Sequence, residues 1–159
     1  MAKEKYPITP AIRVLRQFNI EFEPFEYDYE EKGGTSQTAR ELGVDEHSVI
    51  KTLIFKADSS LICVLMHGDK EASTKELSRL INVKKIDPAD EKTSMNTTGY
   101  QFGGTSPFGH RREIPVYIEE SIMALESIYI NGGKRGFIIK MNPTDINKIL
   151  KPILVNIAI

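Results

Sequence analysis

Two β-rich runs in the first half of the chain constrain its fold more than any other feature. Residues 49–55 (VIKTLIF) and 61–66 (LICVLM) consist mainly of branched apolar residues, and the segment Ala57-Asp58-Ser59-Ser60 lies between them. Short apolar runs bounded by turn residues are typical of neighbouring strands. We therefore predict a β-hairpin here, which requires a sheet covered by other elements.

Short helices are predicted where capping residues precede an apolar face. Thr9 followed by Pro10 is a typical helix start, and Ser73-Thr74-Lys75-Glu76 has the pattern of a capping box. The predicted helices are 10–19 with Ile12, Leu15 and Phe18 inward, 36–42 ended by Gly43, one after Glu76 with Leu77, Leu80 and Ile81 inward, one opened by Asp87-Pro88, and one capped by Asn142-Pro143.

Further strands are predicted at residues 21–29, 116–118, 127–130, 137–141 and 153–159. Pro24 favours an edge position for the first of them. Because strands and helices are mixed without a regular strand–helix alternation, we expect an α/β fold of the α+β type. The 159 residues fit a single domain over 1–159.

Charge and cysteine content exclude several classes of protein. The 21 basic and 22 acidic residues nearly cancel, which argues against a basic nucleic-acid coat. Residues 21–31 hold six acids and no base, whereas residues 131–151 hold five bases and one acid, so a local basic site is expected. No apolar run reaches the roughly 18 residues of a membrane span. The single cysteine, Cys63, fits a reducing, cytoplasmic location, and residues 1–7 lack the apolar core of a secretory signal.

Three segments are candidates for a functional site. Lys51 either covers apolar surface with its stem or reaches into a cleft, where it would bind a phosphate or a carbonyl. The glycines of residues 103–109 (GGTSPFG) are typical either of a surface turn or of a backbone that approaches a ligand closely. Residues 132–136 (GGKRG) are explained by a hairpin turn, although Lys134 and Arg135 would suit a nucleic-acid phosphate.

Metal and nucleophile motifs are not predicted. His47, His67 and His110 have no ligand residues at metal-binding spacing. Cys63 lies within an apolar run and is interpreted as a small core residue. We therefore expect no metal, no cofactor and no covalent protein nucleophile.

In this order, the segments resemble the YbaK family of aminoacyl-tRNA deacylases, which is related to the editing domain of bacterial prolyl-tRNA synthetases. The resemblance implies a mixed, mainly antiparallel, partly barrel-like sheet flanked by short helices. It also implies hydrolysis of the ester in mischarged tRNA, with the substrate's own thiol attacking in cysteine-specific members. The matching stretches are 9–11 (TPA), 27–28 (YD), 49–53 (VIKTL), 97–100 (TTGY), 103–109 (GGTSPFG) and 128–136 (IYINGGKRG).

Site residues follow from this resemblance by position. Lys51 would hold the 3′ end of the substrate, while the loop 103–109 would wrap the adenosine and offer amides to the ester carbonyl. The residues implied for catalysis are Lys51, Gly103, Gly104, Ser106 and Gly133, and those implied for substrate binding are Tyr27, Thr52, Thr105, Pro107, Gly109, Asn131, Gly132, Lys134, Arg135 and Ile138.

The resemblance predicts a trans-editing hydrolase acting on Cys-tRNA(Pro), with prolyl-tRNA synthetase as an expected partner and no membrane partner. Cysteine-editing relatives carry serine at the position of Asn131, and one carries aspartate at that of Ile138, so alanine or another small amino acid stays open as the substrate. Two alternatives stay open as well: a non-catalytic module that binds tRNA, a nucleotide or a synthetase, and a hydrolase of small esters or thioesters.

Overall fold

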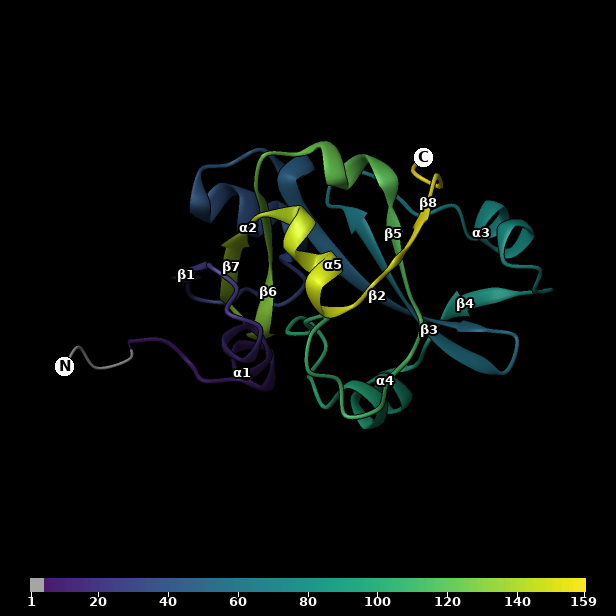
Figure 1. Cartoon of the computed structure of the whole chain (residues 1–159), viewed down its shortest axis with the longest axis horizontal. Coiled ribbons are helices and arrows are strands. Elements are labelled where there is room, and N and C mark those ends of the chain that lie inside the picture. The colour runs from purple at the N-terminus through teal and green to yellow at the C-terminus, as the bar shows by residue number, and fades with distance from the viewer. Residues whose placement is uncertain (1–4) are drawn as a thin grey trace.

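The computed structural model describes residues 5–159, so most of the N-terminal segment considered for a secretory signal lies outside the described residues. Within this range the strands form one sheet in the order β1-β7-β6-β2-β3-β5-β8, with β4 beside β2 (Figure 1). The strands are β1 (Glu23–Glu26), β2 (Val49–Ala57), β3 (Ser60–His67), β4 (Ile86–Pro88), β5 (Val116–Glu119), β6 (Ile128–Lys134), β7 (Phe137–Met141) and β8 (Ile153–Val155).

The sheet is mixed, as predicted. The pairs β1/β7, β6/β7, β2/β3 and β2/β4 are antiparallel, whereas β2/β6, β3/β5 and β5/β8 are parallel. The sheet stays open, because β1 and β8 end the strand order. The predicted hairpin is confirmed, with Ala57 opposite Ser60 and a two-residue turn at Asp58-Ser59.

The helices are short and begin at the predicted capping residues in most cases. Thr9 Oγ1 accepts from the N–H of Ile12, Ser73 Oγ accepts from the N–H of Glu76, and Gly43 ends its helix in the left-handed region at φ 66°. None of the helices in residues 5–159 combines the length and apolar character needed to cross a bilayer. The helices are α1 (Pro10–Gln17), α2 (Gly34–Leu42), α3 (Thr74–Leu80), α4 (Glu91–Thr98) and α5 (Ile146–Ile149), with 3-10 turns at Glu46–Ser48, Glu120–Ala124 and Pro143–Asp145.

One predicted helix start was wrong. Asp87-Pro88 belongs to β4, where Pro88 lies opposite Phe55 of β2. The helix begins only at Glu91, because the side chain of Asp90 accepts from the N–H of Thr93 and caps it. A local Asp-Pro signal was thus overridden by pairing with β2.

Other predicted elements differ in their extent or orientation. The strand predicted at 21–29 covers only Glu23–Glu26, that at 153–159 only Ile153–Val155, and β6 runs on through the glycines to Lys134. Two residues predicted to face the core, Phe18 and Leu80, are 42% and 45% exposed.

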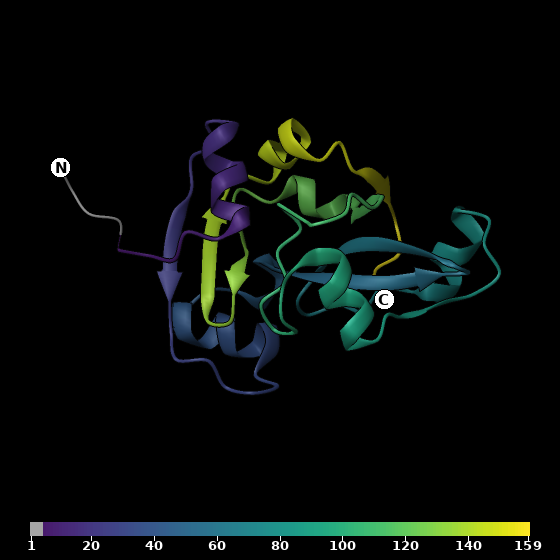
Figure 2. The same ribbon diagram turned by 90° about the horizontal axis from the view of Figure 1, so that it is seen from below.

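Apolar residues pack on both faces of the sheet. Alternate residues of β2 and β3 divide into two clusters, one containing Ile50 and Leu65 and the other Phe55 and Met66. Figure 2 shows α1 beside β6 and β7, with α3 at the far end of the molecule. Cys63 is fully buried in the first cluster, and burial raises the pKa of its thiol to about 12. Its thiol is therefore protonated at neutral pH, as expected of a core residue.

Candidate functional site

A cleft of about 840 Å³ opens along one edge of β2. Its floor is the run Val49 to Phe55, and its walls come from elements far apart in the sequence. Tyr27 and Tyr29 follow β1, Thr38 belongs to α2, and Phe102 precedes the glycine loop. The remaining lining residues are Glu31, Lys32, Gly34, Thr35, Pro88, Ala89, Glu91, Ser94, Gly103, Thr105, Tyr129, Asn131, Arg135 and Ile138.

The cleft lies where the sheet is interrupted. On this side of β2, β6 pairs only with Val49 and Ile50, and β4 pairs only from Phe55 onward. In the described chain no strand lies beside residues 51–53 on that side. Alternate residues of a strand direct their main-chain groups to the same side, and the carbonyl of Ile54 accepts from Ala89 of the β4 side at 3.0 Å. The N–H and C=O of Thr52 therefore face the cleft.

Lys51 lies within this interruption and contributes to the lining of the cleft. It is partly buried, and no carboxylate of residues 5–159 lies within 4.0 Å of its ammonium group. An unpaired cation in a concave site attracts anionic groups of a ligand. The structure thus places Lys51 in the cleft, while its role in catalysis stays a prediction.

The glycine loop is held against the β6–β7 hairpin. A Cβ on Gly104 would lie 2.8 Å from the main-chain nitrogen of Arg135, so only glycine allows this close approach. Asn131 Nδ2 donates to the carbonyl of Gly103 at 3.2 Å. The Oδ1 of the same side chain accepts from the N–H of Gly133 at 2.7 Å. Asn131 therefore connects the two glycine segments and belongs to the frame of the site.

Several main-chain N–H groups of the glycine loop, which were expected to face a substrate, already donate hydrogen bonds within the protein. The N–H of Gly104 donates to the carbonyl of Gln101 at 2.9 Å, and that of Phe108 donates to Ser106 Oγ at 3.1 Å. Ser106 is fully buried, and its carbonyl accepts from Nε2 of His110 at 2.7 Å. The side chain of Ser106 thus stabilises the loop from inside.

The structure brings together about half of the predicted site residues. Seven lie outside the lining of the cleft: Gly104, Ser106, Pro107, Gly109, Gly132, Gly133 and Lys134. Eight lie in the lining: Tyr27, Lys51, Thr52, Gly103, Thr105, Asn131, Arg135 and Ile138.

The deeper wall carries hydroxyl groups, of which those of Thr38 and Ser94 were not predicted from the sequence. Tyr27 Oη shares a hydrogen bond with Thr38 Oγ1 at 2.7 Å, and burial raises the pKa of Tyr27. Thr52 Oγ1 and Ser94 Oγ are buried and have no hydrogen-bond partner in the described chain. Ser94 gave no local signal, since it reaches the cleft only through the packing of α4.

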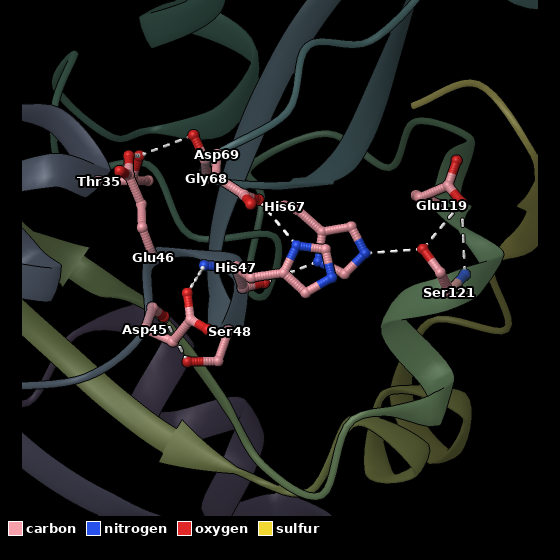
Figure 3. Close-up of polar contacts among 10 residues, drawn as sticks. All are labelled: Thr35, Asp45, Glu46, His47, Ser48, His67, Gly68, Asp69, Glu119 and Ser121. Carbon is pink, nitrogen blue, oxygen red and sulfur yellow. Dashed lines mark hydrogen bonds and ion pairs between the residues drawn. The ribbon is translucent and has the colours of Figure 1, made fainter. Parts of the chain in front are cut away.

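A second polar cluster joins the ends of β2 and β3 (Figure 3). The rings of His47 and His67 stack with centroids 3.7 Å apart and planes at 7°. His47 Nδ1 lies 2.8 Å from a carboxylate oxygen of Asp69. His67 donates from Nδ1 to the carbonyl of His47 at 2.7 Å, and its Nε2 lies 2.7 Å from Ser121 Oγ. This cluster was not predicted, because its three ring and carboxylate groups come together only through tertiary packing and have no local ligand spacing.

This cluster does not suit a shared metal ion, although its ligand atoms lie within 4.8 Å of one another. A metal binds an imidazole nitrogen in the plane of its ring at roughly 2.0–2.1 Å. Because the two rings are stacked, an ion in the plane of one ring lies well outside the plane of the other. Both ring nitrogens of His67 are also engaged in hydrogen bonds.

Comparison with known families and proteins gives a consistent match. The family described as "Aminoacyl-tRNA editing domain" matches residues 30–149. The chain is 29% identical over 146 residues to the Enterococcus faecalis protein named "Putative Cys-tRNA(Pro)/Cys-tRNA(Cys) deacylase EbsC", covering 90% of this chain and 89% of that one. It is also 29% identical over 113 residues to the proline–tRNA ligase of Desulforamulus reducens. This match covers 70% of this chain and 20% of the ligase.

Solved structures agree on the fold. "Crystal structure of a putative trans-editing enzyme for prolyl tRNA synthetase" superposes with a TM-score of 0.82 at 17% identity, covering 96% of this chain and 99% of that one. "Crystal structure of hypothetical protein APE2540" superposes with a TM-score of 0.85 at 18% identity, covering 94% of this chain and 99% of that one. The mixed sheet with short flanking helices is therefore a fold that these proteins share.

Proposed function

The chain belongs to the aminoacyl-tRNA editing domain family, and on this basis we propose that it is a trans-editing deacylase that hydrolyses mischarged aminoacyl-tRNA. The observation that carries the proposal is the cleft at the interruption beside β2, where Lys51 lies unpaired among residues 5–159. The name of the Enterococcus faecalis relative, which aligns over nearly the whole chain, supports the same activity.

In this proposal, the ester between the amino acid and the terminal ribose lies across the gap in the sheet. Attack on the acyl carbon by water releases the free amino acid, and attack by the thiol of the substrate itself releases a cyclic thioester that water hydrolyses afterwards. In both cases the bond to the ribose oxygen breaks, and this oxygen leaves with the proton of the attacking group. Lys51 holds the 3′ end of the substrate, with its ammonium group as a point charge beside the ester. The main-chain N–H of Thr52 faces the cleft and is the donor we assign to the developing oxyanion, since the amides of Gly104 and Gly133 are engaged within their loops.

We propose a small amino acid as the group removed, with cysteine first and alanine second. Ile138 in the cleft lining offers an apolar surface and no carboxylate. A pocket without dedicated hydrogen bonds separates such side chains by only ~10–200-fold. We further propose that residues 1–159 act as one domain, with tRNA(Pro) and prolyl-tRNA synthetase as partners.

The test compares hydrolysis of Cys-tRNA(Pro) and Ala-tRNA(Pro) by the wild type, Lys51→Ala and Lys56→Ala. Lys56 is a matched control because it lies on the same strand but is exposed outside the cleft. Loss of one charge-stabilising group should lower the rate by ~10²–10³-fold in Lys51→Ala, whereas Lys56→Ala should match the wild type. Absence of cleavage by the wild type, with tRNA still bound, would favour the non-catalytic module instead. Full activity of Lys51→Ala would disprove the role of the lysine.

A further inference from the structure

Phe102 stands at the mouth of the cleft on a turn that presents its ring to solvent. The turn is closed by the N–H of Gly104, which donates to the carbonyl of Gln101 at 2.9 Å. Gly103 has φ 84°, the value that a type II turn requires at its third residue. Phe102 occupies the preceding corner position and is 40% exposed. No ring or cation of residues 5–159 stacks on it.

The β6–β7 hairpin fixes both peptide groups of this corner. The carbonyl of Phe102 accepts from Nε of Arg135 at 2.7 Å, and the carbonyl of Gly103 accepts from Nδ2 of Asn131 at 3.2 Å. Gly103 also packs directly on Tyr29, since a Cβ there would lie 2.4 Å from the hydroxyl oxygen. A ring held on so constrained a backbone loses little conformational freedom when a ligand covers it.

Cationic and aromatic residues line the same cleft as Phe102. The guanidinium of Arg135 lies 5.0 Å from the centroid of the Tyr29 ring, and both residues line the cleft together with Lys32. Single-stranded RNA is recognised by this combination, in which unstacked bases lie on aromatic faces and cations meet the phosphates. A free π-face next to Arg135, in a cleft that Lys32 also lines, therefore suits a nucleobase attached to phosphate.

We propose that Phe102 is the stacking platform for the 3′-terminal nucleobase of the RNA whose ester occupies the cleft. This inference rests on the proposed function and adds a binding subsite to it. The base lies on the ring of Phe102, and the neighbouring phosphate lies near Arg135 and Lys32. The acyl group then extends inward along β2 toward Lys51.

The test measures binding of the trinucleotide CCA and of the same trinucleotide with an abasic 3′ ribose. The proteins are the wild type, Phe102→Ala, Phe102→Leu, Phe102→Trp and Phe18→Ala. Phe18 is a matched control because it is 42% exposed at the end of α1, outside the cleft. Phe102→Leu keeps apolar bulk without a π-face, and thermal unfolding of each variant reports whether it is folded.

Stacking predicts that Phe102→Ala and Phe102→Leu bind CCA about 5- to 150-fold more weakly, which corresponds to ~1–3 kcal/mol per stacked base. Phe102→Trp and Phe18→Ala should match the wild type within a factor of about two. The abasic ligand should bind weakly to the wild type and equally weakly to Phe102→Ala, because the two changes remove the same contact. Equal binding of CCA to the wild type and Phe102→Ala would overturn the proposal.

Binding and hydrolysis are measured separately, so the two proposals fail in different ways. A wild type that hydrolyses Cys-tRNA(Pro) but binds CCA independently of Phe102 retains the proposed function and refutes the stacking site. A wild type that hydrolyses no aminoacyl-tRNA but binds CCA through Phe102 retains the stacking site and refutes the deacylase.

Discussion

Lowering the pH from 7 to 5 is expected to destabilise the protein through two histidines, the buried His67 and the partly buried His110. Burial lowers the pKa of His67 below its ordinary value of 6.5, and it also lowers the pKa of His110. The groups facing His67 are His47, Asp69, Glu119 and the hydroxyl of Ser121 (Figure 3). The Nδ1–H of His67 donates to the carbonyl of His47, and its Nε2 lies 2.7 Å from Ser121 Oγ, which in turn lies 3.0 Å from Glu119 Oε2.

The direction of this change in stability depends on how many protons the folded and the unfolded states bind. Below pH 6.5 the unfolded chain binds a proton at each histidine, while the folded protein resists binding, so the free energy of unfolding falls as the pH falls. A histidine that stays neutral in the folded state and has pKa 6.5 when unfolded costs about 1.9 kcal/mol between pH 7 and pH 5. His67 and His110 together set an upper bound of about 3.8 kcal/mol. Carboxylates with lowered pKa, such as Asp69, act only at lower pH.

Urea unfolding at pH 7, 6 and 5 measures this dependence. In His67→Asn the amide nitrogen can replace Nδ1 as donor, so the variant should fold while the pH-dependent loss shrinks by up to about 1.9 kcal/mol. Ser121→Ala weakens the same network without removing the titrating ring, so it should keep the pH-dependent loss. A loss in His67→Asn as large as that in the wild type would refute the assignment to His67.

Two further predictions concern packing and the C-terminal segment. Gly104→Ala places a Cβ 2.8 Å from the main-chain nitrogen of Arg135, and should cost ~1–3 kcal/mol in urea unfolding and slow deacylation. Gly43→Ala meets nothing within 4 Å of its Cβ, and its backbone strain at φ 66° arises at a helix end outside the cleft lining, so it should leave deacylation unchanged. Glu119→Ala removes the acceptor of the N–H groups of residues 157–158 at 2.7 and 3.0 Å, so hydrogen exchange of both amides should accelerate, and unchanged exchange would refute this anchoring role.

The parts of the fold predicted correctly are those specified by local chemistry. Thr9, Ser73 and Gly43 act within one helical turn of their own position, and each was assigned its capping role from sequence. The prediction of a helix start at Asp87-Pro88 was wrong, because Asp90, three residues after Asp87, is the residue that caps the helix. Only the pairing of β4 with β2, a contact between distant segments, decides between the two.

The candidate site was partly predictable for the same reason. Lys51 is placed by its own strand, whereas Tyr29 and Phe102 reach the cleft only through the packing of loops 73 positions apart in sequence. His47 and His67 were treated as separate residues, yet the hairpin register sets Ile50 opposite His67 and so brings both rings to one end of the hairpin. The hairpin was predicted without a register, and His47 lies in the 3-10 turn before β2, so the stack had no local signal in the sequence.

The interruption beside β2 also protects the sheet from unwanted pairing. An exposed strand edge normally invites another chain to add a strand, which leads to aggregation. Here the unpaired stretch covers only residues 51–53, because the pairing with β6 stops after Ile50 and Ile54 already accepts from the N–H of Ala89 next to β4. At roughly 3.3 Å per residue, the gap is about 10 Å long. That length admits one small polar group to the main chain of Thr52 but is too short for an incoming strand to pair with it.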